Sequence, residues 1–520
     1  MRTTLLALFG LLPACWTFNP QTDFVQRTYF PSPPPPMTSV EMPTPAFAKT
    51  RGFTTHAELM AFLDKHATAH PDRATLTIIG ESQKGRDIPM IRIAGSDPRI
   101  RIFLQGGLHG DEPGGTEGLL LLVYHLLEDP AYQSLVDQID VAIVPIANPD
   151  GFERQHRYAA NGLDLNRDQT QLEVHESPAL KRAFHEVDPA VAVDFHEYRA
   201  YRRDFLWLGT RGISNPYDVM FLYSGNLNVP ETLRSLTNNV FVQAVREEMD
   251  DRGLRHHDYV TTRKVHRDIW FNQGSVQSRS SATNWALANT VSLLVEVRGV
   301  ALGRDAFERR VLTSFWVAAQ VLRTAAEDPD RVHTVLAQTT GLPNEIAVTQ
   351  EPTVHDGQLK AIDVASHGMI DLDVTLRDNL QSKATLIRSR PEAYAILPGA
   401  DALVDKLRTL GLEVVPLSAP AELSVERYDV RDVRREPYPY EGQRQQDVTV
   451  EVSAGTQTLP AGSHLVRLDV PGANIALEVF EPECPNSFVS FGVVRARPGK
   501  PLPFVRVTGG AAELLSTSVR

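Results

Sequence analysis

Residues 102–112, Ile102-Phe103-Leu104-Gln105-Gly106-Gly107-Leu108-His109-Gly110-Asp111-Glu112, decide the fold. The stretch begins with an apolar run that suits a buried β-strand, and glycines at three of the next six positions allow the backbone to turn sharply. A helical pattern over residues 117–127 follows. The sequence here therefore predicts a strand, a tight turn and a helix, the unit from which α/β proteins are built.

The same alternation of strands and helices continues on both sides of this stretch. Short apolar segments typical of buried strands occupy residues 76–79, 88–93, 141–146, 191–195 and 291–295. Helical patterns lie between them and after them, the last over residues 306–326. We therefore expect an α/β domain over residues 51–330, with a mixed, largely parallel sheet and helices on both faces.

The amino-terminal 50 residues predict export and a spacer. Arg2 precedes an apolar run over residues 5–12 that is too short to span a bilayer, so residues 1–15 resemble an export signal. Cys15 follows a segment similar to a bacterial lipoprotein cleavage box, which leaves two alternatives: a periplasmic or cell-envelope lipoprotein anchored at Cys15, or a secreted protein. The proline-rich residues 16–50 favour an extended spacer.

Residues 331–520 predict an accessory region of α+β type that is rich in β-strands. A strand over residues 393–397 precedes a helix over residues 403–410, and further strands are expected at 448–452, 465–470 and 475–480. The formal net charge of the chain is −12, which argues against a general nucleic-acid binder because such a protein needs a basic surface.

Three residues with metal-binding side chains fall at strand ends. His109 and Glu112 lie on the glycine-rich turn, and His196 ends the apolar run 191–195. The carboxyl ends of parallel strands meet at one edge of a sheet, where α/β proteins build their sites. Two histidines and a carboxylate, with a fourth position open to water, are the ligand set of a hydrolytic zinc site. The plain alternative for His196 is a structural histidine.

Glu296 directly follows the apolar run 291–295 and is the candidate general base. A carboxylate at the end of a buried strand is costly unless it is paired or functional. An ion pair with Arg298 is the structural alternative.

The ordered set of motifs resembles the carboxypeptidase A-like zinc metallocarboxypeptidases (funnelin-type peptidases) over residues 53–328. The set comprises Gly80 to Arg86, His109-x-x-Glu112, Asn148-Pro149-Asp150-Gly151, Gly162-Leu163-Asp164-Leu165-Asn166-Arg167, and the strand-end His196 and Glu296. The resemblance implies one Zn²⁺ per chain, bound by His109, Glu112 and His196, with Glu296 taking a proton from water. It implies hydrolysis of the last peptide bond of peptides or proteins.

The resemblance also implies roles for four further residues. Asn166 and Arg167 would hold the terminal carboxylate of the substrate, and Arg157 would stabilise the oxyanion of the scissile carbonyl. Asp164 would orient the first zinc histidine, its alternative being a surface turn residue. Family members carry a mobile tyrosine before the base, but residues 272–284 contain none, and neither Tyr259 nor Trp270 aligns with it.

Substrate specificity and rival functions remain open from the sequence. Arg279, near the expected terminal-residue pocket, favours either an acidic side chain or plain solvation, and solvation is the simpler reading. A first rival is an amidohydrolase for cell-wall peptides or acyl-amino acids on the same scaffold. A second is an exported binding protein without catalysis.

Overall fold

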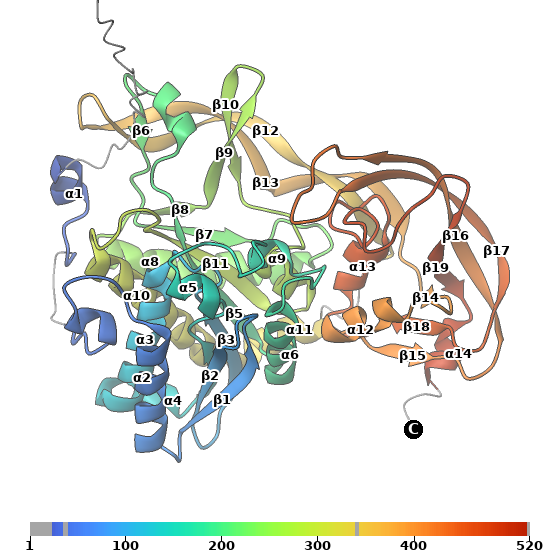
Figure 1. Ribbon diagram of the computed structural model, residues 1–520, viewed down its shortest axis with the longest axis horizontal. Helices are drawn as coiled ribbons and strands as arrows, with labels where there is room; N and C mark the ends of the chain where they lie inside the picture. The colour runs from blue at the N-terminus through green and yellow to red at the C-terminus, as the bar shows by residue number, and fades with distance from the viewer. Residues whose placement is uncertain (1–22, 35–39, 339–342, 517–520) are drawn as a thin grey trace, which may run out of the picture.

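The computed structural model describes residues 23–34, 40–338 and 343–516. Its largest sheet has eight strands in the order β1-β2-β4-β3-β5-β11-β7-β8 (Figure 1). These strands are β1 (Ala74–Glu81), β2 (Asp87–Ala94), β3 (Ile100–Gly106), β4 (Ile139–Val144), β5 (Val191–Tyr198), β7 (Val219–Tyr223), β8 (His256–Asp258) and β11 (Val291–Arg298). The four central strands, β4, β3, β5 and β11, run parallel, which confirms the predicted mixed, largely parallel sheet.

Helices cover both faces of this sheet because its strands are apolar on both sides. Phe103 of β3 packs against Phe184 and Trp285 on one face, whereas Ile102 and Leu104 join the main core on the other. The helices are α2 (His56–Ala69), α3 (Pro113–Glu128), α4 (Gln133–Val136), α5 (Pro149–Glu153), α6 (Ser177–Val187), α7 (Glu231–Leu236), α8 (Gln243–Asp251), α9 (Ser281–Leu287), α10 (Phe307–Glu327) and α11 (Pro329–Gln338). Helices α3 and α10 pack together on the main-core face, and α6 and α9 lie on the other.

A second sheet of five strands joins distant parts of the chain. Its order is β6-β12-β13-β10-β9, with β6 (Ile213–Ser214), β9 (Val260–Val265), β10 (Asp268–Gln273), β12 (Glu345–Asp363) and β13 (Met369–Ser389). Strand β13 pairs in parallel with β10, so the accessory region shares a sheet with the α/β domain. The predicted boundary after residue 330 therefore does not separate two independent sheets. Figure 1 shows this sheet above the main body.

A third sheet of six strands fills the carboxyl-terminal region. It comprises β14 (Ala393–Ile396), β15 (Val414–Pro416), β16 (Ala421–Arg435), β17 (Gln446–Leu459), β18 (His464–Arg467) and β19 (Pro501–Gly509), with α12 (Asp401–Thr409), α13 (Asn474–Phe480) and α14 (Ala511–Ser516). The region is rich in strands as predicted. The strand expected over residues 475–480 is wrong, because this segment forms α13. All its residues are buried, and a short run that is apolar on every side does not distinguish a strand from a buried helix.

The proline-rich segment differs from the extended spacer that its composition predicts. Residues 23–29 form α1 (Asp23–Tyr29), and a short 3-10 turn spans Pro45–Ala48. Val25 and Phe30 pack against Ile362, and the guanidinium of Arg298 lies 3.7 Å from the centre of the Phe30 ring. The apolar and aromatic side chains between the prolines therefore dock this segment onto the body.

The predicted export signal, residues 1–15 with Cys15, lies outside the described residues. Within the described ranges, no helix combines the length and the apolar character that crossing a membrane requires.

Candidate metal centre

His109 and Glu112 lie on the turn between β3 and α3. Gly107 adopts φ +62°, and a Cβ atom at Gly110 would lie 2.0 Å from the backbone carbon of Gly151. Only glycine allows this approach of two backbone segments. Helix α3 begins at Pro113, directly after Glu112. The position of the turn is thus set by backbone contacts, and it directs both side chains to the edge of the sheet.

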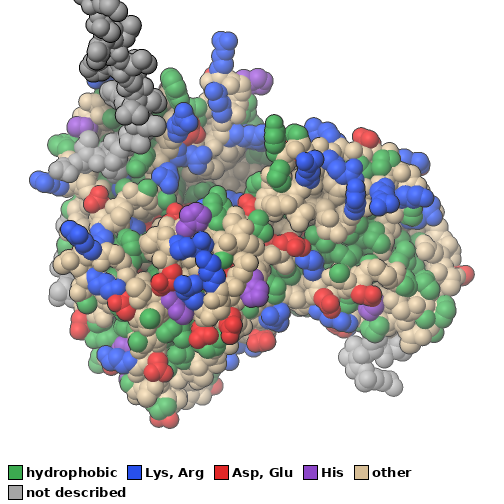
Figure 2. All heavy atoms as spheres, in the orientation of Figure 1, with side chains coloured by type: hydrophobic (Ala, Val, Ile, Leu, Met, Phe, Trp, Pro, Cys, Tyr) green, Lys and Arg blue, Asp and Glu red, His purple; other side chains and the backbone are tan. Residues whose placement is uncertain are grey.

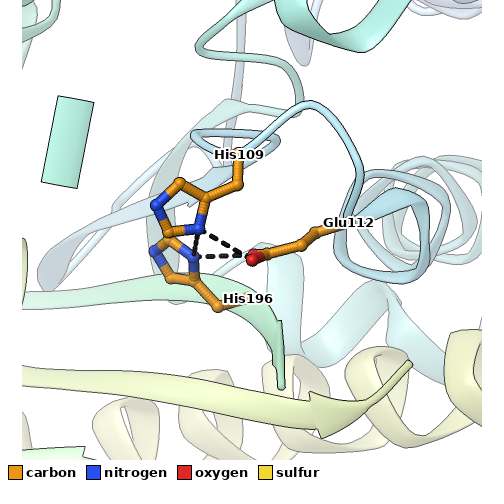
Figure 3. A group of neighbouring side chains, drawn as sticks. All are labelled: His109, Glu112 and His196. Carbon is orange, nitrogen blue, oxygen red and sulfur yellow. Dashed lines mark hydrogen bonds and ion pairs between the residues drawn. The ribbon is translucent and has the colours of Figure 1, made fainter. Parts of the chain in front are cut away.

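His196 and Glu296 lie at the same level of the neighbouring parallel strands β5 and β11, where they are register partners. The Nδ1 atom of His196 is 2.9 Å from Nδ1 of His109 and 2.8 Å from Oε2 of Glu112, whose Oε1 is 2.8 Å from Nδ1 of His109. Figure 3 shows these side chains converging from the turn and the strand. The structure therefore brings together the three residues that the sequence predicts as metal ligands.

The hydrogen bonds of the two imidazoles determine which nitrogen faces inward as an acceptor. Nε2 of His109 is 3.1 Å from the Asp164 carboxylate, and Nε2 of His196 is 2.9 Å from that of Asp194. An ionised carboxylate only accepts hydrogen bonds, so with a cation at the centre each Nε2 carries a proton toward its aspartate and each Nδ1 turns its lone pair to the cation. Two lone pairs and the Glu112 carboxylate then face one another at 2.8 to 2.9 Å.

A cation at the centre of this cluster would satisfy all three side chains. The three side chains are at most 3% exposed, so water cannot neutralise their mutual repulsion. Two imidazole nitrogens and a carboxylate oxygen are the ligands that Zn²⁺ prefers in catalytic sites. The donor set therefore fits zinc.

The charges of neighbouring side chains shift the pKa values of His196 and Glu112. Burial favours the neutral imidazole, but the carboxylates of Asp194 and Glu112 outweigh it and hold the pKa of His196 well above its usual value. Burial also opposes ionisation of Glu112, yet His109 and His196 lower its pKa. Without a metal ion, both shifts favour a protonated His196 beside an ionised Glu112, and a bound cation would take the place of that proton.

Asp164 connects the centre to the loop that follows it. Its carboxylate faces His109 and accepts hydrogen bonds from Nε and Nη2 of Arg157 at 3.1 and 2.8 Å and from the backbone N–H of Asn166 at 2.8 Å. Nη1 of Arg157 lies 3.2 Å from Nδ1 of His109 and 3.5 Å from the Glu112 carboxylate. Asp164 is 4% exposed, so the surface-turn alternative is wrong.

A cavity of about 460 Å³ opens beside the centre. His109, Glu112, Arg157, Asn166, Arg167 and Glu296 all contribute to its wall. The loop after β5, strand β9 and the turn before α9 provide further wall residues, and Figure 2 shows this side of the molecule hollowed between the second sheet and the main body, with Lys and Arg side chains at the border. The polar wall suits a charged ligand.

Glu296 faces this cavity. Burial, assisted by the nearby Glu112 carboxylate, raises the pKa of Glu296 to about 7, while His196, His109 and Arg157 oppose the rise. A carboxyl group with a pKa near neutrality accepts and returns a proton readily. Arg298 has partners elsewhere: it donates to the Asn215 carbonyl and lies over the Phe30 ring.

Tyr259, which does not align with the family's mobile tyrosine in the sequence, also lines the cavity. It lies between β8 and β9, and burial together with the Glu296 carboxylate raises the pKa of its phenol to about 12. Tyr259 and Glu296 are 37 positions apart along the chain, so nothing in the sequence indicated that they lie close together.

Three residues of the carboxyl-terminal region reach the site, and no motif indicated them. Glu441 accepts a hydrogen bond from the backbone N–H of Asp164 at 2.8 Å. Asn486 accepts one from Arg279 at 3.1 Å, and the Tyr440 ring lies 5.2 Å from the Arg279 guanidinium. Arg279 is therefore enclosed by this region, and the expectation that it is simply solvated is wrong.

Comparison with known proteins finds a zinc carboxypeptidase domain in this chain. Residues 59–189 match the model of the zinc carboxypeptidase family. Carboxypeptidase 2 of Trichophyton rubrum is 27% identical over 446 residues, which cover 82% of this chain and 81% of that protein. The chain therefore carries a zinc carboxypeptidase domain. It is thus a metallocarboxypeptidase of a family that depends on zinc and acts on peptide carboxyl termini.

Other carboxypeptidases resemble shorter parts of the chain. Carboxypeptidase SOL1 of Arabidopsis thaliana is 34% identical over 138 residues, covering 25% of this chain and 28% of that protein. A metallo-carboxypeptidase from Burkholderia cenocepacia, known from its crystal structure, superposes with a TM-score of 0.42 at 17% identity, covering 52% of this chain and 70% of that one. The similarity to the Trichophyton rubrum protein, in contrast, extends beyond the predicted catalytic domain, residues 51–330.

Proposed function

We propose that this zinc carboxypeptidase hydrolyses the terminal peptide bond of peptides or proteins, with one Zn²⁺ held by His109, Glu112 and His196. The observation that carries the proposal is the convergence of three buried acceptor atoms next to Glu296. A bound zinc ion supplies Lewis acidity, which polarises a carbonyl and acidifies water.

Residues of the chain then transfer the proton, stabilise the developing charge and hold the other groups in position. Glu296, on the strand beside His196, accepts the proton that water gives up and returns it to the departing amine. Arg157, whose Nη1 points toward the centre, stabilises negative charge on the scissile carbonyl. Asp164 fixes both His109 and Arg157 through its carboxylate.

Asn166 and Arg167 hold the terminal carboxylate of the substrate. The Asn166 amide oxygen accepts from the backbone N–H of Ser281 at 2.9 Å, which fixes its orientation. Nη1 of Arg167 donates to the Asn166 carbonyl at 2.7 Å, and the rest of the guanidinium faces the cavity. A planar guanidinium forms two parallel hydrogen bonds with a carboxylate, so this pair suits a free peptide terminus.

The test is incubation of the full chain with a mixed peptide library, analysed by mass spectrometry. We expect loss of single carboxyl-terminal residues, abolished by a chelator and by Glu296→Gln, while elemental analysis of Glu296→Gln still finds one zinc per chain. Intact peptides under every condition would leave only the binding-protein alternative. Cleavage confined to cell-wall peptides or acyl-amino acids would establish the amidohydrolase instead.

We further propose that residues 1–15 direct export, with Cys15 as the lipid-bearing first residue of an envelope protein. The mass of the mature amino terminus tests this assignment. A lipidated Cys15 supports the anchored form, an unmodified start further along the chain supports simple secretion, and an intact Met1 in the fractionated cell envelope or medium overturns both.

A further inference from the structure

We propose that Arg279 makes the site selective for peptides that end in Asp or Glu, and that the carboxyl-terminal region holds Arg279 in place for this purpose. The inference rests on the proposed function, because it concerns the last residue of the same substrate.

Arg279 is a cation without an anionic partner. It lies on the cavity wall, in the turn before α9, and its side chain donates one hydrogen bond, from Nη1 to the Asn486 amide oxygen at 3.1 Å. Among the described residues the partners of its side chain are the Asn486 amide and the Tyr440 ring, with no ion pair, and burial lowers the pKa of its guanidinium. A partly buried charge of this kind is stabilised when a ligand supplies the opposite charge.

The protein's own acceptors do not satisfy the donors of this turn. Nε of Arg279 is buried without a hydrogen-bond partner in the described part of the chain, and so is the hydroxyl of Ser280, the next residue on the wall. The two carboxylates whose charges act on Arg279 are engaged elsewhere: Glu441 accepts from the Asp164 backbone, and Asp164 pairs with Arg157. A substrate in the cavity can supply the missing acceptor.

A second unpaired guanidinium lies in the same cavity. Arg167 forms no ion pair within the described ranges, and its side chain bonds only the Asn166 carbonyl. Arg167 and Arg279 are close enough for the charge of one to disfavour the charge of the other. Two neighbouring cations match the two carboxylates of a terminal Asp or Glu, one from the main chain and one from the side chain. A terminal Leu leaves one cation unpaired, and a terminal Lys adds a third positive charge.

The carboxyl-terminal region fixes the position of Arg279. Asn486 also donates to the Gln277 side chain at 3.1 Å, and its carbonyl accepts from Thr170 at 3.4 Å, so the loop that carries it spans the turn before α9 and the segment after Arg167. The Tyr440 ring packs against the guanidinium from another loop of the same region. An arginine restrained in this way selects a charge at a defined position, whereas a free one would only attract anions.

The experiment measures kcat/KM of the full chain on four peptides that differ only in the last residue: Glu, Asp, Leu or Lys. We expect Glu and Asp to exceed Leu by about 10- to 100-fold, the usual effect of one charged hydrogen-bonding partner, and Lys to be the poorest. Arg279→Gln should abolish this preference, and Arg279→Glu should shift it toward Lys.

Two further variants separate charge at the right position from charge in general. Asn486→Asp keeps Arg279 but gives it an internal carboxylate partner at the 3.1 Å contact, so the preference for Glu should fall as in Arg279→Gln. Arg199→Gln removes an exposed arginine of the same cavity and should keep the ratio of Glu to Leu. Zinc content and circular dichroism of each variant report whether it is folded.

The outcomes distinguish this inference from the proposed function. If the wild-type chain releases no terminal residue from any peptide, the proposed function fails. If it cleaves the Leu or Lys peptide better than the Glu peptide, or if folded Arg279→Gln keeps the wild-type ratio, only the acidic specificity is overturned.

Discussion

Replacing Asp164 by Asn probes how the metal centre and the substrate loop are coupled. The wild-type carboxylate faces Nε2 of His109, accepts two hydrogen bonds from Arg157, and accepts one from the Asn166 backbone. The charges of His109, Arg157 and Arg167 hold the pKa of Asp164 well below its usual range, although burial opposes ionisation, so the native group is a carboxylate. An asparagine keeps the size of the side chain but removes its charge and turns one acceptor into a donor.

The expected loss has two parts. Removing the carboxylate partner of a metal-bound histidine costs about 10- to 100-fold in metal affinity. Releasing Arg157 from its two hydrogen bonds costs about a further 100-fold in kcat at saturating zinc, since displacement of a group by about 1 Å has this effect. Asp194→Asn is the matched control: Asp194 faces Nε2 of His196 at 2.9 Å but makes no contact with Arg157.

Competition with a chromophoric chelator measures the zinc affinity, and kcat at saturating zinc measures the second part. Both variants should lose zinc affinity, and Asp164→Asn should lose substantially more activity than Asp194→Asn once zinc is saturating. Equal activities of the two variants under that condition would refute the positioning of Arg157 by Asp164. Unchanged zinc affinity in both would refute the tautomer argument for the ligand histidines.

Four further results are expected. Glu296→Gln should retain zinc by elemental analysis and lose about 10²- to 10⁴-fold in kcat/KM, the usual contribution of a general base; a drop below tenfold contradicts this role. His196→Ala should lose both zinc and the stabilisation that added zinc gives in thermal melts, whereas an unchanged metal content would place the ion elsewhere. Peptides with an amidated terminus should resist cleavage in the wild type, and activity on them equal to that on free termini would exclude the role of Arg167. Burial lowers the pKa of Lys181 from 10.5 to about 7. Between these pH values the unfolded chain binds a proton that the folded chain lacks, so the free energy of unfolding rises with pH. Urea titrations at several pH values should find a smaller rise in Lys181→Met, and an identical dependence on pH in both proteins would contradict this prediction.

The central sheet and the convergence of the site residues could be predicted from the sequence because each signal is local. The apolar run before Gly106 and the run that ends at His196 are strands whose register places their ends together, and a parallel sheet gathers such ends on one edge. His109 and Glu112 need only the turn between them. Glu296 needs only its strand to lie beside that of His196.

The remaining features depend on contacts between residues far apart in the chain. The segment 475–480 became a helix because its burial on all sides is decided by the elements that pack around it. The proline-rich segment docks through Phe30, whose partner Arg298 is more than 260 positions away. Tyr259 reaches the cavity through the second sheet, which pairs β10 with a strand from beyond residue 368.

The local contacts and the contacts between distant residues surround different parts of the site. The three side chains proposed to bind zinc, together with Glu296, come from strand ends and one turn, and under the proposed function they carry out the reaction. The groups around Arg279 come from residues 440 to 486, and Glu441 reaches the backbone of Asp164 across 277 positions. Because the same region contacts both the loop behind the metal and the turn that carries Arg279, we infer that it belongs to the substrate site and is not a separate appendage. The similarity to the Trichophyton rubrum carboxypeptidase, which continues past residues 51–330, is consistent with a catalytic unit that includes this wall.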